Sequence, residues 1–188
     1  MTSAVMRSPI QLDDNVLGFG RKGLHALRHA IVQPGTEPAA ILQEAGYAAG
    51  DEIYACFCKW LPGYAGVQEP AELDAAKLGE VLSEFFQSLG WGSLAVERLG
   101  PAGLTIDSPD WAEVEPQANA TQPSCFLSSG ILAHFFGRLA ESTVAVMEVE
   151  CRSCNDARCR FLAGSPDTLQ LVYDAMAAGR DYRQALLE

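Results

Sequence analysis

Four of the six cysteines in this 188-residue chain lie between positions 125 and 159, close enough in sequence to form one site. Cys151, Cys154 and Cys159 fall in a single nine-residue window, and Cys125 precedes them. Thiolates on one turn, joined by a thiol from a distant segment, are typical donors of a structural zinc site. Glu148, three residues before Cys151, offers a carboxylate oxygen. The spacing predicts metal binding, and redox chemistry is the alternative.

The remaining cysteines are predicted to have different environments. Cys125 is expected in the first turn of a helix that Ser124 caps, where the helix dipole favours the thiolate form that binds metals. Cys56 and Cys58 stand two positions apart on another predicted helix, so they do not share a face. We interpret both as packing residues, because a lone cysteine usually behaves as a small buried hydrophobe.

The composition limits the classes of function. The net charge is −11 and the isoelectric point is about 4.6, so the surface would repel nucleic acids and anionic membranes. The first residues contain no apolar run typical of a signal peptide, and no stretch of 18 apolar residues occurs. We therefore expect a cytoplasmic protein, in which clustered cysteines bind metals more often than they form disulfides.

Two other patterns suggest chemistry that their surroundings do not support. Residues 18–23 match G-x-G-x-x-G, but no buried strand is predicted before them and helices follow, so a dinucleotide site is not expected. His25 and His29 share a helix face but have no carboxylate near them in the sequence. We interpret them as surface residues.

Periodicity and chain breakers predict the elements that position these residues. Residues 1–15 are expected to form an arm, and residues 16–188 a single domain. Pro62 and Gly63 are expected to stop the second helix, and Pro70 to start the third, which Gly90 closes. Helices are predicted over 20–31, 38–61, 70–89, 125–139 and from 166 onward, and strands over 92–97, 104–107, 143–151 and 159–163. This order favours an α+β fold, with helices packed on an antiparallel sheet.

The C-terminal half resembles the 4-vinyl reductase domain family, through Cys125–Leu132, Glu148–Cys151 and Cys159–Phe161. The pattern is most similar to the zinc-containing sensory domain of phenol-responsive, sigma-54-dependent bacterial regulators. Residues 41–50 and 90–92 also look like family landmarks. The resemblance implies a homodimer with the ligand-binding fold that vesicle-tethering transport-particle subunits share.

The same resemblance implies a ligand set for the metal. It assigns zinc to Cys125, Glu148, Cys151 and Cys159. Cys154 would then be a spare thiol or a ligand in place of Glu148.

The resemblance also implies a buried cavity for a small aromatic molecule. Trp91 is a candidate wall residue, because it lies where the third predicted helix leads into the first strand. His134 is a candidate polar group for orienting a ligand, at a position where relatives tend to have glycine. Phe85, Trp111 and Phe135 are further candidates, although aromatic residues such as these dominate ordinary cores.

The sequence therefore predicts a zinc-stabilised, standalone domain that senses or carries a small hydrophobic or aromatic molecule. Because no output domain is recognisable on the chain, any signal is expected to pass through another protein. One alternative is an accessory protein or reductase in (bacterio)chlorophyll or other tetrapyrrole biosynthesis. Catalysis by the chain alone is not expected, since no nicotinamide or flavin site is recognisable. The second alternative is a dimeric assembly scaffold.

Overall fold

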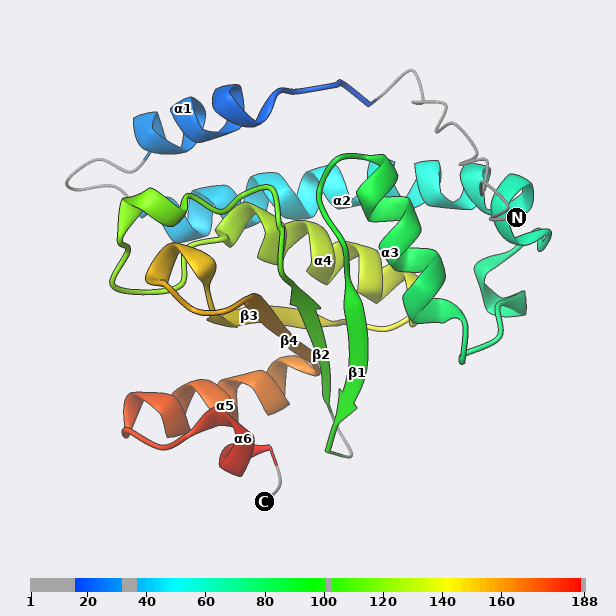
Figure 1. Cartoon of the computed structure of the whole chain (residues 1–188). Coiled ribbons are helices and arrows are strands. Elements are labelled where there is room, and N and C mark those ends of the chain that lie inside the picture. Colours follow the sequence, from blue (N-terminus) through cyan, green and yellow to red (C-terminus); the bar gives the residue numbers. More distant parts are fainter. Residues whose placement is uncertain (1–15, 32–36, 101–102, 187–188) are drawn as a thin grey trace, which may run out of the picture.

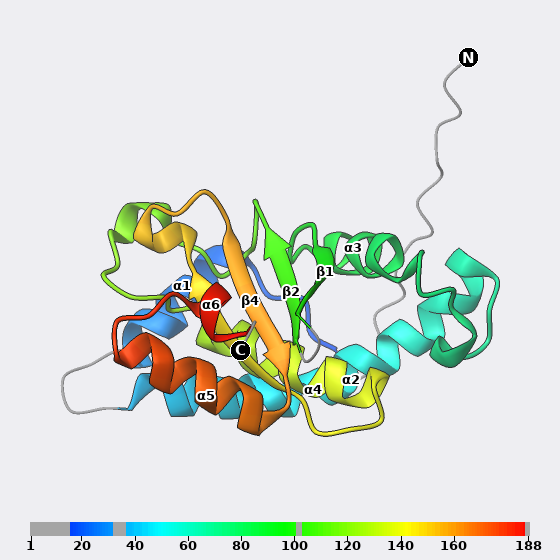
Figure 2. The same ribbon diagram turned by 90° about the horizontal axis from the view of Figure 1, so that it is seen from below.

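Helices cover both faces of a four-stranded antiparallel sheet in the computed structural model, which describes residues 16–31, 37–100 and 103–186 (Figure 1). Helices α2 and α4 form a layer on one face, and α1 lies outside α2. Helices α5 and α6 cover the opposite face, as the view from below shows (Figure 2). The predicted α+β fold is confirmed. The predicted arm, residues 1–15, lies outside the described residues.

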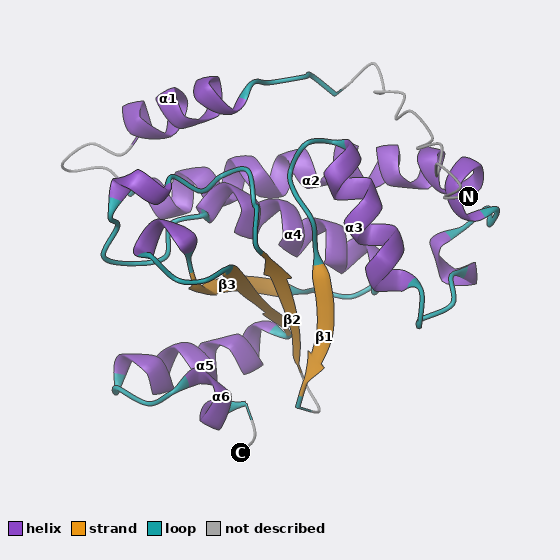
Figure 3. Ribbon diagram, in the orientation of Figure 1, coloured by secondary structure: helices purple, strands orange, loops and turns teal. Residues whose placement is uncertain are grey.

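The sheet has the order β1-β2-β4-β3, and β4 is one of its two inner strands. Colouring by secondary structure shows the strands between the two helical layers (Figure 3). The strands are β1 (Ala95–Leu99), β2 (Gly103–Ser108), β3 (Ala145–Glu150) and β4 (Cys159–Gly164). The helices are α1 (Arg21–Ile31), α2 (Pro38–Ala65), α3 (Leu78–Ser88), α4 (Phe126–Leu139), α5 (Pro166–Ala177) and α6 (Tyr182–Ala185). None of the described helices is both long and apolar enough to cross a membrane.

Glycines allow α2 and α4 to approach until their backbones touch. A Cβ atom on Gly46 of α2 would lie 2.0 Å from the carbonyl oxygen of Leu127, and one on Gly130 of α4 would lie 2.1 Å from that of Gln43. Any larger residue at either position would push the helices apart. This contact fixes the position of α4 over the sheet.

The main core between α2, α4 and the sheet is rich in aromatic rings. Phe135 of α4 lies within ring-packing distance of Phe57, Phe85 and Phe86, at centroid separations of 6.1 Å or less. A second, smaller core on the other face of the sheet joins Leu162 of β4 to α5 and α6. The inner strand β4 therefore contributes to both cores.

Three element boundaries differ from the sequence predictions. Helix α2 continues through Pro62 to Ala65 and ends at Gly66, which has a left-handed φ of 73°. Proline forfeits one helix hydrogen bond, and here the stacked rings of Trp60 and Tyr64 span the position. Pro70 begins only a 3₁₀ turn, η1 (Pro70–Glu72), and α3 starts later. The sequence analysis also missed α6, which is one turn long.

Candidate metal centre and ligand cavity

Four side chains from three segments meet where α4 begins above the β3–β4 hairpin. Their ligand atoms all lie within 4.8 Å of one another, and all four residues are buried: Cys125, Glu148, Cys151 and Cys159. The N-cap of α4 supplies Cys125, strand β3 supplies Glu148, and the ends of the hairpin supply the other two thiols. The structure thus brings together the four ligands that the resemblance assigned.

The donor chemistry of this cluster fits a divalent metal ion. The Sγ atoms of Cys125 and Cys151 are 3.8 Å apart, and Glu148 accepts a 2.8 Å hydrogen bond from the Cys125 N–H through Oε2. The other carboxylate oxygen, Oε1, is buried and has no hydrogen-bond partner among the described residues. Three thiols and one spare carboxylate oxygen form a tetrahedral donor set of the kind that zinc prefers.

Without an ion, the donors share protons unevenly. Burial, followed by the nearby Cys151, raises the pKa of Glu148 to about 8. Hydrogen bonds from the thiols of Cys125 and Cys159 lower the pKa of Cys151. The same contact, from the donor side, raises the pKa of Cys125 well above its ordinary value. A cation at the centre would replace these protons, because metal binding requires deprotonated ligands.

Carboxylates rather than a capping hydroxyl satisfy the first N–H groups of α4. Ser124 was predicted as the N-cap, but the N-cap is Cys125, whose side chain makes no capping bond. Glu148 accepts from the Cys125 N–H, and the buried Glu113 accepts from the N–H groups of Leu127 and Ser128. A hydroxyl at residue 124 is not needed, because two acids from distant segments take its role.

Helix α1 is connected to this helix start through Arg28. The buried Arg28 side chain lies 3.2 Å from Glu113 Oε1 and donates to the carbonyl oxygens of Glu113 and Ser124. The guanidinium thereby neutralises a buried carboxylate and spans the two segments. No local pattern in the sequence indicates this contact, since Arg28 and Glu113 are 85 positions apart.

The other cysteines lie outside the cluster. Cys154 is partly exposed at the end of η3 (Arg152–Cys154), and burial raises the pKa of its thiol to about 11. Cys56 is buried in the main core, as predicted, whereas Cys58 is partly exposed.

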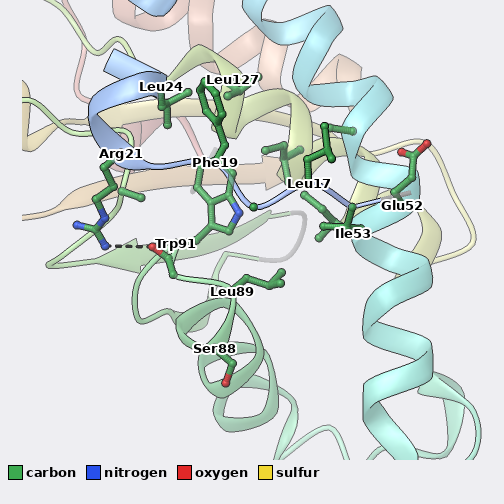
Figure 4. Close-up of a pocket in the computed structure, with 16 residues that line it drawn as sticks. Leu17, Phe19, Arg21, Leu24, Glu52, Ile53, Ser88, Leu89, Trp91 and Leu127 are labelled. Carbon is green, nitrogen blue, oxygen red and sulfur yellow. Dashed lines mark hydrogen bonds between the residues drawn. The ribbon is translucent and has the colours of Figure 1, made fainter. Parts of the chain in front are cut away.

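A cavity of about 500 Å³ lies beside α1, between α2, α4 and the segment after α3 (Figure 4). Its lining is mostly apolar and includes Leu24, Ile53, Trp91, Leu127 and Ile131. A volume of this order is typical of pockets for small organic ligands.

Two charged side chains also line the cavity, Arg21 from α1 and Glu52 from α2. Arg21 donates a 3.0 Å hydrogen bond to the Gly90 carbonyl oxygen, which joins α1 to the loop that carries Trp91 (Figure 4).

Of the five predicted pocket residues, Trp91 lies at this cavity and the other four lie elsewhere. Phe85 and Phe135 are fully buried in the aromatic core. Trp111 is also buried, and its indole N–H donates to Ser128 Oγ at 2.6 Å. His134 lies at the α2–α4 contact, with Nε2 3.3 Å from Asp51 Oδ1 and its ring 4.7 Å from that of Tyr47.

The interpretation of His25 and His29 as residues without a carboxylate partner was wrong. Glu115, which precedes η2 (Pro116–Ala118), contacts both imidazoles. The partner is distant in sequence, so helix periodicity could not reveal it. Residues 18–20 of the glycine motif lie in a loop before α1, with no strand among the described residues that precede it.

Comparisons with known proteins agree with this architecture. Residues 110–165 match the family model of the vinyl-4-reductase domain. No curated protein sequence matches the chain.

Two solved structures share the fold. The phenol-responsive sensory domain of the transcription activator PoxR, with phenol, aligns with a TM-score of 0.61 at 15% identity, covering 79% of this chain and 76% of that one. A vinyl-4-reductase family protein from Methanocaldococcus jannaschii aligns with a TM-score of 0.50 at 21% identity, covering 76% and 77%. The expected resemblance to the 4-vinyl reductase domain family is therefore confirmed, and the chain carries a domain of this family over residues 110–165.

Proposed function

We propose that this chain is a zinc-stabilised domain that senses or carries a small hydrophobic or aromatic molecule. The buried donor set of three thiols and one carboxylate supports the choice of zinc. The apolar lining and the size of the cavity support an organic ligand. The likeness of the fold to a sensory domain solved with phenol is consistent with this class of ligand.

One observation carries the proposal: α4 belongs to both the metal cluster and the cavity. Its N-cap is the ligand Cys125, and Leu127 and Ile131, within the next two turns, line the cavity. An ion that fixes the start of α4 therefore also fixes one wall of the cavity. Zinc would have a positioning role, and the ligand would bind to side chains rather than to the ion.

The binding test uses phenol and 1-naphthol as probes in isothermal titration calorimetry. We expect both to bind, and 1-naphthol to bind more tightly, because a cavity of about 500 Å³ has room for more than one ring. Failure of both probes to bind the zinc-loaded protein would contradict the proposed ligand class.

A pair of neighbouring alanines on α2 provides matched variants. Ala49 lines the cavity, whereas Ala48 is exposed and does not. Ala49→Trp should fill the cavity and weaken 1-naphthol binding by at least about tenfold, or about 1.4 kcal/mol. Ala48→Trp should leave binding unchanged. Equal effects of the two substitutions would place the site elsewhere.

The homodimer and the cytoplasmic location that the sequence suggested remain part of this proposal. Large apolar side chains on α1 and the segment before it support self-association: Leu17 is 88% exposed, Phe19 66% and Leu27 51%. Light scattering after size exclusion should give the mass of a dimer, and Phe19→Ser with Leu27→Ser should give a monomer. A wild-type chain that is monomeric at all concentrations would exclude the dimer.

A further inference from the structure

Two histidines and one carboxylate form a second group of metal donors, separate from the cysteine cluster. His25 and His29 are one turn apart on α1, and Glu115 lies opposite them. His29 Nε2 is 3.1 Å from both oxygens of Glu115, and His25 Nδ1 is 3.4 Å from Oε1. Donor atoms around a tetrahedral zinc ion with bonds of about 2.1 Å are themselves about 3.4 Å apart. The nitrogen–oxygen distances here match that spacing.

The hydrogen bond on the far side of His25 determines which nitrogen faces the carboxylate with a lone pair. His25 Nε2 lies 3.3 Å from the Ala112 carbonyl oxygen. A carbonyl can only accept, so Nε2 carries the hydrogen, and Nδ1 of the neutral ring presents its lone pair to Glu115. Two lone pairs repel unless a proton or a cation lies between them. Donation of the second ring N–H to a carbonyl is also the usual support of a metal-bound histidine.

Glu115 is held in place from behind by the hairpin of the cysteine cluster. Its backbone N–H donates to Ser153 Oγ at 3.0 Å, and Ser153 is buried. The side chain is only 24% exposed, like that of His25. The carboxylate is thus positioned before any ion arrives, which reduces the entropic cost of binding.

The local charge also permits a cation. Arg28 Nη1 lies 3.7 Å from Glu115 Oε2, but the same guanidinium contacts the buried Glu113 at 3.2 Å. Two carboxylates face one guanidinium, so the group retains net negative charge when both imidazoles are neutral. An ion at Glu115 would therefore not enter a positively charged site.

We propose that His25, His29 and Glu115 bind a divalent transition-metal ion, such as zinc, at a site distinct from the cysteine cluster. Among the described residues, the cysteine cluster is the group whose donors already lie within 4.8 Å of one another. Binding must therefore draw the His29 imidazole inward, and His29 is 68% exposed and has room to turn. Imidazole and carboxylate ligands suit zinc, nickel or cobalt.

Such an ion would fasten α1 to the segment that follows β2. Helix α1 also supplies Arg21 and Leu24 to the cavity wall. The site would therefore hold one side of the cavity closed, whether or not the proposed ligand class is correct.

Cobalt(II) titration of protein whose cysteine cluster is already loaded with zinc tests the proposal. A site of two imidazoles and a carboxylate should give weak visible bands, without the intense near-ultraviolet charge-transfer band of cobalt bound to thiolates. We expect one saturable equivalent of this type. A thiolate band alone, or no binding below millimolar cobalt, would overturn the proposal.

Variants on α1 identify the ligands. His29→Gln lies on the surface and should fold normally, and it should weaken cobalt binding at least about tenfold, as should Glu115→Gln. His134→Gln is the matched control, because His134 also faces a carboxylate, Asp51, but has no second histidine. Unchanged binding in His29→Gln, or an equal loss in His134→Gln, would show that these residues do not form the site.

Discussion

Burial and position distinguish the metal-binding thiols from their neighbour at the residue scale. Cys151 is fully buried within the cluster, whereas Cys154 lies at the end of the turn and is partly exposed. The sequence alone left Cys154 open as a ligand in place of Glu148. The structure orients the Glu148 carboxylate into the cluster, with one oxygen unused.

We predict opposite outcomes for serine substitutions at these two positions. Cys151→Ser should abolish stoichiometric zinc binding and destabilise the fold by about 3 kcal/mol or more, which lowers Tm by about 6–12 °C. Cys154→Ser should retain the metal and the Tm. Elemental analysis and thermal unfolding measure both effects. Zinc loss in Cys154→Ser, or full retention in Cys151→Ser, would contradict the assigned ligand set.

Asp110 fastens the loop that carries Trp91. It accepts hydrogen bonds from the N–H of Ser93 at 2.8 Å and from Ser93 Oγ at 2.7 Å. Burial acts to raise the pKa of Asp110, but the bonds from Ser93, helped by Ser108, outweigh it and lower the pKa below the ordinary value of 3.8. The carboxylate is therefore more acidic in the folded chain than in the unfolded one.

This shift predicts a specific pH dependence. A carboxyl group with a lowered folded-state pKa stabilises the fold above about pH 4, and that contribution is lost as pH falls through the folded value. Wild-type protein should be more stable than Asp110→Asn at pH 7, and the difference should vanish below about pH 3. Urea unfolding across this range measures the difference. A gap that stays constant with pH would show that the Asp110 charge is not responsible.

At the scale of elements, the contact between α2 and α4 depends on the absence of side chains. A Cβ atom on Gly130 would lie 2.1 Å from a carbonyl oxygen and 2.7 Å from the Tyr47 nitrogen. In contrast, a Cβ atom on Gly79 in α3 would have its nearest neighbours at 3.9 Å, in ordinary contact. The same substitution therefore has opposite expected effects at two helical positions.

Gly130→Ala should cost about 3 kcal/mol or more, because backbone atoms of α2 must move to admit the methyl group. Gly79→Ala should stabilise the protein by about 0.5–1 kcal/mol, because alanine is the better helix former and has room. Chemical denaturation of both variants measures the two values. If Gly130→Ala is as stable as the wild type, the helices do not pack this closely.

The elements that the sequence predicted well are those fixed by local chemistry. Ser165 and Pro166 mark the start of α5, and the Ser165 side chain accepts from the N–H of Thr168 as expected of an N-cap. The β-branched runs indicated the strands, and the spacing of Glu148 and Cys151, with the family resemblance, indicated the ligands. Each of these signals lies within a few residues of the feature it predicts.

What the sequence could not predict depends on partners far along the chain. Pro62 remains inside α2, and the α4 start needs no capping hydroxyl, because tertiary contacts supply what local sequence lacks. Glu115 is likewise invisible as a partner of His25 and His29 until α1 packs beside it. Four of the five predicted pocket residues are aromatic or polar groups that the core or the helix contact uses instead.

For the whole molecule, the metal cluster joins two parts of the vinyl-4-reductase domain, the start of α4 and the β3–β4 hairpin. Removing the ion should therefore weaken the fold globally and also loosen the cavity wall on α4. We predict that chelation lowers Tm by about 6–12 °C and weakens 1-naphthol binding, and that added zinc restores both. Scanning calorimetry and probe titration before and after chelation measure these effects. If chelation removes the ion but changes neither quantity, zinc does not stabilise the fold.

Strand β4 contributes to two cores, and this has a consequence for the motions of the chain. Phe161 points into the main aromatic core and Leu162 into the core beneath α5 and α6, while β2 and β3 pair with the strand on either side. Its amide hydrogens can reach solvent only when both cores open, so they should exchange last with deuterated water. The single turn of α6, which has a small core on one side, should exchange among the first. The slowest opening of the protein is thus the separation of its two helical layers from one shared strand.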